Sequence, residues 1–402
     1  MNPADPRPSG SAGGGRRPLL VLAGLSAFGP LTTDVYLPGF PGMAADLHAS
    51  AAAAQLTLTA CVIGLALGQL FIGPLSDMTG RRLPLLSCLG VFTAASLGCA
   101  AAPSLPLLIA GRFLQGASGA GGVVVARAVV RDVFAGDEAA RAYSNLSAIV
   151  TSGPIFAPLL GALILLFSDW RGIFVGLAVI GVLLAIAVHR VIAETLPIAD
   201  RKAHAVSDTL RNVVVLLRHR RYLAYVLSGA FGFGTMFAYI SASSFVYQDV
   251  FGTSAQLYSV LIAINGLALM SSNVVNGRLV ARVGQERLLR RGLGGLLGGS
   301  SAIAIAAIAG AGPAAILPLL LLTVGCVGFV ISNSVALAMA GEPARAGAAS
   351  ALFGLFQFSV GAAVAPLVGI AGSSAIPMGV AMAGSAAVAF LSYRLLGRSA
   401  PA

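Results

Sequence analysis

The chain has 402 residues, of which 57% are hydrophobic and only 10% are charged, and its mean hydropathy is +0.90. Because a typical soluble domain has about 25% charged residues, this composition excludes a soluble protein and indicates an integral membrane protein. The formal net charge of +11 would suit a nucleic-acid-binding protein, but the arrangement of the charges argues against that function.

Apolar runs of roughly 20 residues have the length of a transmembrane helix. Twelve such runs follow one another, so we expect an all-α integral membrane protein with twelve transmembrane helices. The runs are centred near Gly29, Gly64, Val91, Ala117, Pro154, Leu183, Gly234, Leu267, Gly298, Gly325, Val360 and Val388.

The basic residues alternate regularly with these runs. If the N-terminus lies inside the cell, 23 of the 25 Lys and Arg residues fall in inside segments, Arg112 lies within a run, and only Arg171 falls outside. This is the positive-inside pattern, so we expect a multi-pass protein of the bacterial inner membrane with both termini cytoplasmic. A basic face beside anionic lipid accounts for the net charge, and we expect lipid rather than nucleic acid as a partner.

Residues 1–17 are rich in Pro, Gly, Ser and Arg and are expected to form a disordered cytoplasmic tail. The apolar run that follows is long enough to span a bilayer, so we expect it to stay as an anchor rather than to be cleaved as a signal peptide. It contains Asp34, and we expect Pro38 and Pro41 to break or kink its outer end.

The second run ends in a carboxylate, a glycine and two arginines: Asp77, Gly80, Arg81 and Arg82. Gly80 supplies the permissive backbone of a tight turn, and the two arginines mark the cytoplasmic side. A carboxylate near two cations also suits a tie between neighbouring helix ends. An ordinary helical-hairpin turn with basic flanks fits the spacing equally well.

The stretch from Gly73 to Arg82 resembles the loop 2–3 signature of the major facilitator superfamily, with its two glycines, aspartate and two arginines at the signature spacing. One position differs from the signature: the family usually has Arg or Lys directly after the aspartate, and this chain has Met78. The resemblance implies the major facilitator fold, in which two pseudo-symmetric halves have six helices each.

The fourth run carries Arg112-x-x-Gln115-Gly116 and continues to Asp132. It is rich in glycine, but no strand precedes it, so close helix packing explains the glycines better than a phosphate-binding loop.

The fifth run contains two prolines, Pro154 and Pro158, which are expected to bend it. Gly153, Ala157 and Gly161 are four residues apart and therefore share one helix face. This face is expected to pack closely against another helix.

Two local matches indicate an internal repeat. Residues 73–80 resemble 277–284 at an offset of 204, and residues 157–161 resemble 365–369 at an offset of 208. Offsets close to half the length indicate duplicated six-helix halves, with the substrate site between them near the bilayer midplane. We expect a tail at 1–17, an N-terminal half at 18–193, a cytoplasmic linker with an amphipathic helix at 194–220 and a C-terminal half at 221–397.

Asp34 and Arg112 are the clear membrane-embedded charges. Placing each charged side chain in the bilayer costs at least ~2.5–3.5 kcal/mol on insertion scales. Asp34 lies seven residues before Pro41 and Arg112 six after Pro106, so each is roughly 10 Å below the outer boundary. Equal depth permits an ion pair. Burial raises the proton affinity of a carboxylate, and a nearby arginine lowers it, so the pair suits proton coupling. A static buried salt bridge is the alternative.

Further motifs extend the resemblance to a subfamily and to other spans. The stretch from Thr33 to Pro38 resembles the first-span signature of the Bcr/CflA subfamily of drug:proton antiporters. The Arg112 motif resembles the superfamily's fourth-span motif, which is linked to proton coupling. The stretch from Gly153 to Gly161 resembles the fifth-span motif associated with antiport.

The resemblance implies that Asp34 and Arg112 couple transport to protons. It also implies that Asp77, Arg81 and Asp132 steady the outward-facing state. The residues expected to act in conformational change or gating are Gly73, Asp77, Gly80, Arg81, Arg82, Asp132, Gly153, Pro154, Pro158 and Gly161.

Polar side chains in other spans are candidates for lining the substrate cavity, although each also suits a hydrogen bond between helices. These candidates are Tyr36, Gln115, Asn145, Tyr239, Asn265, Asn273, Asn333 and Gln357. The four cysteines lie in spans without metal-ligand spacing, so we expect packing roles and no metal site.

The sequence therefore predicts a transporter that exports small, partly hydrophobic drugs, such as bicyclomycin or chloramphenicol-type compounds, in exchange for protons by alternating access. We expect a monomer without cofactors, driven by the proton gradient. A metabolite or sugar carrier of the same fold is the alternative. A membrane enzyme or receptor would need a soluble catalytic domain, a metal site or a nucleophile–base cluster, and the sequence contains none of these patterns.

Overall fold

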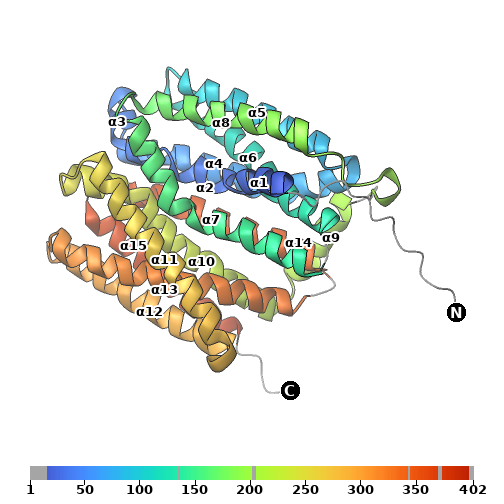
Figure 1. Ribbon diagram of the computed structural model, residues 1–402. Helices are drawn as coiled ribbons and strands as arrows, with labels where there is room; N and C mark the ends of the chain where they lie inside the picture. The colour runs from blue at the N-terminus through green and yellow to red at the C-terminus, as the bar shows by residue number, and fades with distance from the viewer. Residues whose placement is uncertain (1–15, 135, 202–204, 343–344, 370–373, 398–402) are drawn as a thin grey trace.

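The computed structural model describes residues 16–134, 136–201, 205–342, 345–369 and 374–397. Figure 1 shows two helical bundles side by side, the first running from α1 to α8 and the second from α10 to α15. We call the end of the bundles that carries Arg81 and Arg220 the basic end. The end that carries Asp46 and Arg171 is the opposite end.

The first half contains α1 (Arg16–Ser26), α2 (Phe28–Asp34), the 3-10 turn η1 (Leu37–Gly39), α3 (Phe40–Asp46), α4 (Ala51–Thr79), α5 (Arg82–Ala100), α6 (Leu105–Val133), α7 (Gly136–Ile164) and α8 (Trp170–Val191). The connecting segment contains η2 (Ile198–Asp200) and α9 (Ala205–Leu216). The second half contains α10 (Arg220–Phe245) with the π-helical turn η3 (Val246–Val250), α11 (Ala255–Val283), α12 (Gln285–Ile308), α13 (Pro313–Ala340), α14 (Ala346–Gly369) and α15 (Ala375–Leu396).

In the described part of the chain, eleven helical stretches are long and apolar enough to cross a bilayer, with the broken helix from Pro18 to Asp46 counted as one. α7 is as long as α4, and its described apolar segment is the shorter Ser152–Ile164. All twelve predicted centres fall within these helices. The predicted all-α, multi-pass membrane fold is therefore confirmed.

The first span is broken near its outer end, as its prolines predict. α2 ends at Asp34, and the chain passes through η1 before α3 begins. Since a proline has no N–H, the carbonyls four residues before Pro38 and Pro41 lose their α-helical donors. The break therefore leaves backbone acceptors that groups from other helices can use.

One helix is repeated closely in the two halves. α4 and α11 each have 29 residues, and each follows a serine, Ser50 or Ser254, whose hydroxyl accepts a hydrogen bond from the N–H three residues later. They are followed by Gly80 and Gly284, with φ of 100° and 86°. Because L side chains rarely adopt these values, glycine is required at both turns. The correspondence supports the internal repeat, and the exact domain boundaries stay a prediction.

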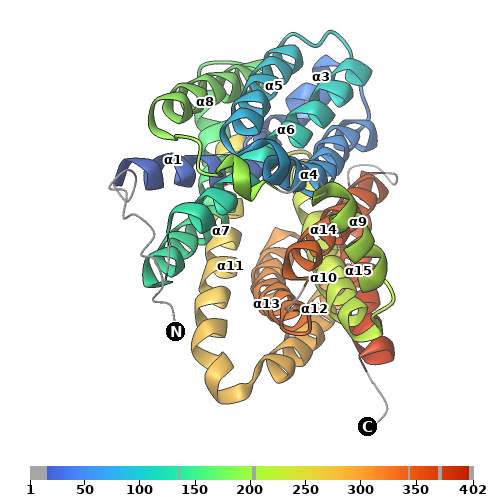
Figure 2. The same ribbon diagram turned by 90° about the vertical axis from the view of Figure 1, so that its right-hand side faces the viewer.

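The halves meet where α4 packs against α14 and where α7 packs against α11 (Figure 2). In the described residues, the side-chain hydrogen bonds that join the two bundles come from Gln55, Thr59, Ser244 and Gln248. All four lie toward the opposite end. The opposite end is therefore the closed end of the molecule in this conformation.

The linker helix α9 contacts α4 and α14 at the basic end (Figure 2). Leu216 is fully buried, whereas Leu210, Val214 and Leu217 are 43%, 55% and 42% exposed. The apolar side chains thus divide between the protein and an outward surface. The placement of this helix on the membrane surface stays a prediction.

Candidate functional site

Asp34 ends α2 and lines a small buried pocket between the two halves. The second half supplies Tyr239 from α10 and Asn265 from α11, together with apolar side chains such as Met236 and Leu269. The free volume is about 20 Å³, which is room for about one water molecule. A larger ligand requires the halves to move apart.

The polar groups of the buried pocket are not fully paired. Asp34 is only 6% exposed and forms none of the ion pairs found among the described residues. An unpaired carboxylate in apolar surroundings is costly, and binding a proton or a cation removes that cost. The Tyr239 hydroxyl and Asn265 Oδ1 are buried without a hydrogen-bond partner in the described structure, an arrangement that is rare unless a ligand or water completes it.

Arg112 is fully buried within the first half. Its Nη2 donates a hydrogen bond to the Thr32 carbonyl at 2.7 Å, and its Nη1 donates to Gln115 Oε1. The guanidinium carbon lies 4.0 Å from the centre of the Tyr36 ring, a favourable cation–π geometry. Arg112 therefore joins α6 to α2.

The ion pair that the equal depth of Asp34 and Arg112 permits is not formed among the described residues in this conformation, so the structure does not show the static salt bridge that was the alternative. Arg112 contacts the backbone of α2 inside the first half, whereas Asp34 faces the second half across the buried pocket. The sequence gives the depth of each residue, but the direction of a side chain depends on how its helix is rotated. The proton-coupling roles of both residues stay predictions.

Two predicted cavity residues belong to the Arg112 cluster instead of the pocket. The Tyr36 hydroxyl lies 3.2 Å from Thr57 Oγ1, and Gln115 Nε2 donates to Ser96 Oγ at 2.7 Å. Both side chains are buried. They hold Arg112 and the first span in place.

Two predicted cavity asparagines join α11 to α13. Asn333 donates to Asn276 Oδ1 at 2.6 Å, and Ser332 donates to Asn273 Oδ1 at 2.8 Å. Hydrogen bonds between helices were the alternative role expected for these polar side chains. In this conformation, Asn273 and Asn333 are therefore engaged in packing.

The last two predicted cavity residues lie outside the pocket lining. Asn145 is exposed on α7, and Gln357 is half-buried on α14. The structure thus brings Tyr239 and Asn265 to the buried pocket with Asp34 and leaves the other candidates elsewhere.

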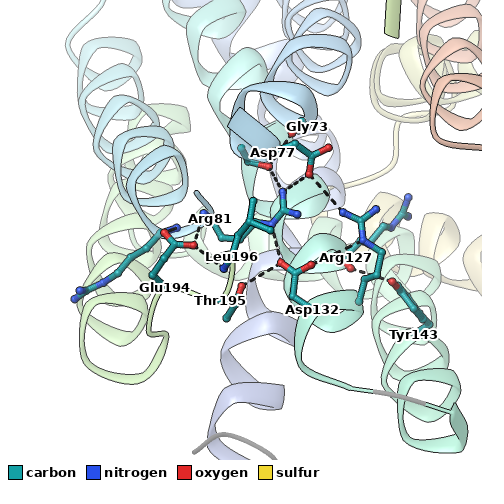
Figure 3. A network of polar contacts seen from close by, with 12 residues as sticks. Gly73, Asp77, Arg81, Arg127, Asp132, Tyr143, Glu194, Thr195 and Leu196 are labelled. Atoms are coloured by element: carbon teal, nitrogen blue, oxygen red, sulfur yellow. Dashed lines mark hydrogen bonds and ion pairs between the residues drawn. The ribbon is translucent and has the colours of Figure 1, made fainter. Parts of the chain in front are cut away.

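Arg81 is 1% exposed and organises a network of polar contacts at the basic end (Figure 3). Its Nη1 donates to Asp77 Oδ1 at 2.5 Å and to Ser76 Oγ at 2.8 Å, and its Nε donates to Asp132 Oδ2 at 2.7 Å. Two carboxylates thus compensate one buried cation, which would otherwise be costly. The network ties the end of α4 to the end of α6.

Sequence reasoning missed Glu194, which follows α8. Its Oε1 accepts hydrogen bonds from the Arg81 and Leu196 N–H groups at 2.8 and 3.0 Å, and its Oε2 accepts from the Arg82 N–H at 3.2 Å. Partial burial alone raises the pKa of this carboxyl, but the three backbone donors and the charge of Arg201 lower it overall. The Arg81 and Arg82 N–H groups lie more than a hundred residues earlier in the chain, so no spacing pattern in the sequence indicates these contacts.

The remaining residues of the Gly73–Arg82 signature lie around the Arg81 network. A Cβ atom added to Gly80 would lie 2.5 Å from Glu194 Oε2, so both the backbone angle and this contact require glycine. Arg82 donates to the His189 carbonyl at 2.9 Å. A Cβ atom added to Gly73 would lie 3.1 Å from the Val124 side chain.

The small-residue face of α7 packs against the first span. Cβ atoms added to Gly153 and Gly161 would lie 2.1 and 1.8 Å from atoms of that span, which is closer than any side chain allows. Pro154 lines the buried pocket, and Pro158 is buried within α7. The face therefore fixes α7 to the helix that carries Asp34.

Two helical bundles with a shared pocket between them are the architecture of a membrane transporter. The family model of the Major Facilitator Superfamily matches residues 21–366. The chain therefore belongs to the major facilitator superfamily and is a transporter rather than an enzyme.

Individual relatives agree with this assignment and with the Bcr/CflA resemblance. The chain is 40% identical to an uncharacterized MFS-type transporter, YdgK, of Bacillus subtilis, with 93% of each chain covered. It is 33% identical to a bicyclomycin resistance protein homolog of Haemophilus influenzae, over 94% of this chain and 95% of that protein. It is 31% identical to a chloramphenicol resistance protein of Pseudomonas aeruginosa, over 72% and 68%.

The fold is also similar to that of a solved transporter. The crystal structure of a bacterial homologue of the human lysosomal transporter Spinster superposes with a TM-score of 0.74 and 16% identity, over 96% of this chain and 98% of that one. This likeness confirms the fold.

Proposed function

We propose that this protein exports small, partly hydrophobic drugs in exchange for protons by alternating access. The observation that carries the proposal is the position of Asp34, an embedded carboxylate without a cation partner in a pocket that both halves build. A site shared by both halves is exposed to either side of the membrane as they rock. The names of two relatives support drugs such as bicyclomycin or chloramphenicol-type compounds as substrates.

Asp34 exchanges the proton for the drug. When the pocket opens inward, the carboxyl releases its proton and the drug enters. When the pocket opens outward, the drug leaves and the carboxyl takes up a proton, which neutralises it for the return. Tyr239 and Asn265 offer the drug hydrogen bonds, and the apolar lining holds its body.

Arg112 acts on Asp34 through the first span. It binds the Thr32 carbonyl two residues before Asp34, so a movement of α6 moves the carboxylate as well. The network of Asp77, Arg81 and Asp132 joins α4 to α6 at the basic end. We infer that these contacts, with the α7 glycine face, make the first half move as a unit.

The basic end faces the cytoplasm of a bacterial cell, because 23 of the 25 Lys and Arg residues lie on that side of the spans. Both termini are then cytoplasmic, and the closed opposite end faces outward. The transporter works as a monomer in the inner membrane and is driven by the proton gradient.

A metabolite or sugar carrier of the same fold remains the second candidate. A sugar presents several hydroxyl groups, and its site needs a matching number of polar side chains. The pocket has three polar side chains, Asp34, Tyr239 and Asn265, in a largely apolar lining. This composition favours a partly hydrophobic drug.

Expression in a host that lacks its own efflux pumps tests the proposal. A panel of antibiotics and dyes should identify compounds to which the protein raises tolerance, and a protonophore should remove that tolerance. Uptake of a labelled sugar or metabolite without any raised drug tolerance would favour the second candidate.

A further inference from the structure

The break in the first span creates hydrogen-bond acceptors at the opposite end. In an α-helix, the Leu37 carbonyl would accept from the N–H of residue 41, but Pro41 has none. The Phe40 N–H donates to Leu37 instead, in the 3-10 turn. A carbonyl oxygen has two lone pairs, so one stays open to another helix.

Ser244 of the second half occupies the open Leu37 acceptor, and Gln248 binds the next carbonyl, that of Pro38. Ser244 Oγ donates to the Leu37 carbonyl at 2.6 Å, and Gln248 Nε2 donates to the Pro38 carbonyl at 3.2 Å. Gln248 Nε2 also donates to Ser244 Oγ at 2.8 Å. The amide thus uses both hydrogens, and the hydroxyl accepts one bond while donating another.

These bonds lie between two spaces. On one side is the buried pocket, which Leu37 and Ile240 line. On the other is an outer hollow of about 330 Å³, which Pro38 and Gln248 line. In the first half, the adjacent residues Leu37 and Pro38 line the two spaces, and in the second half Ile240 and Gln248 are about two helical turns apart. A drug that leaves the pocket outward, or a proton that enters it, must cross this layer.

We propose that Ser244 and Gln248 form a latch with the Leu37 and Pro38 carbonyls, which holds the outer end closed and opens once in each transport cycle. The inference rests on the proposed orientation and on alternating access, and it does not depend on the identity of the drug. Water in the outer hollow can replace each bond when the latch opens, so the net cost of opening is small. A polar latch therefore closes the path and still opens readily.

Labelling of a single cysteine tests the latch without any drug. The four native cysteines are replaced by alanine, and Met236→Cys places a reporter in the buried pocket. A membrane-impermeant maleimide is added to right-side-out or everted vesicles, so that the ratio of labelling rates from outside and inside can be measured. Ser244→Ala and Gln248→Leu should each raise this ratio about fivefold, which corresponds to the net loss of one hydrogen bond.

Ser241→Ala is the matched control, because Ser241 is equally buried on α10 but its hydroxyl donates to Ala238 of its own helix. It should leave the ratio unchanged. An unchanged ratio in both latch variants would overturn the proposal. Faster labelling from both sides alike would also overturn it, because that result indicates a loosened fold rather than a shift toward the outward-open state. Drug tolerance is measured separately, so failure of the latch is distinguishable from failure of the proposed function.

Discussion

At the scale of single residues, the two embedded charges have different surroundings. Arg112 is compensated by a backbone carbonyl, a glutamine and an aromatic ring inside one half. Asp34 faces the second half without a cation. A compensated charge holds structure in place, whereas an uncompensated one is available to a proton or a ligand. This difference supports the proposal that Arg112 positions the first span and that Asp34 exchanges the proton.

Arg112→Leu should destabilise the protein. It leaves the Thr32 carbonyl and Gln115 Oε1 buried without their donor, at about 1–3 kcal/mol for each unsatisfied group. The unfolding temperature of the protein in detergent should fall by several degrees. Phe113→Leu, at the exposed neighbouring position, should change it little. An unaltered unfolding temperature in Arg112→Leu would mean that the cluster is not structural.

Gly116→Ala should also destabilise, for a steric reason. The added Cβ would lie 2.0 Å from the Cys61 carbonyl oxygen, so α6 must move away from α4. Gly90→Ala on α5 is the control, because nothing lies within 4 Å of its added Cβ, and alanine there should stabilise the helix by about 0.5–1 kcal/mol. If thermal unfolding showed the same shift for both variants, the close approach of α4 and α6 would be refuted.

At the scale of elements, the Gly80 and Gly284 turns differ in their surroundings. An added Cβ at Gly80 meets Glu194, whereas nothing lies within 4 Å at Gly284. The turn of the first half thus holds the start of the linker, and its counterpart in the second half is open. We infer that the repeat became specialised at this turn.

Glu194→Gln tests this specialisation. The amide keeps the shape but removes one acceptor oxygen and the charge that faces the N–H groups of Arg81 and Arg82. The linker should be cleaved several-fold faster by trypsin, while insertion in the membrane stays normal. Glu138→Gln, at an exposed position on α7, should leave cleavage unchanged. Equal cleavage of wild type and Glu194→Gln would show that the linker is held by other contacts.

The sequence predicted elements better than contacts, for physical reasons. Apolar runs locate spans because the bilayer imposes length and hydropathy, and Pro38 and Pro41 locate the break because proline lacks an N–H. Equal depth permitted an ion pair between Asp34 and Arg112, but depth does not give the rotation of a helix, and the two side chains point in different directions. Glu194 could not be predicted, because it binds backbone groups of a distant turn.

At the scale of the whole molecule, the two halves are joined by side-chain hydrogen bonds toward the opposite end and share the small pocket that contains Asp34. The pocket, with about 20 Å³ of free volume, cannot hold a drug in this conformation. Transport of a drug therefore requires the halves to move apart, and we propose that the Asp34 carboxylate links this motion to the proton.

The most direct measurement follows an imposed pH gradient in everted vesicles when a drug from the tolerance screen is added. Wild type should dissipate the gradient, because each exported drug is exchanged for protons at Asp34. Asp34→Asn should bind the drug but leave the gradient intact, and its normal unfolding temperature would show that the fold is retained. Dissipation of the gradient by Asp34→Asn at the wild-type rate would contradict the assignment of proton exchange to this carboxylate.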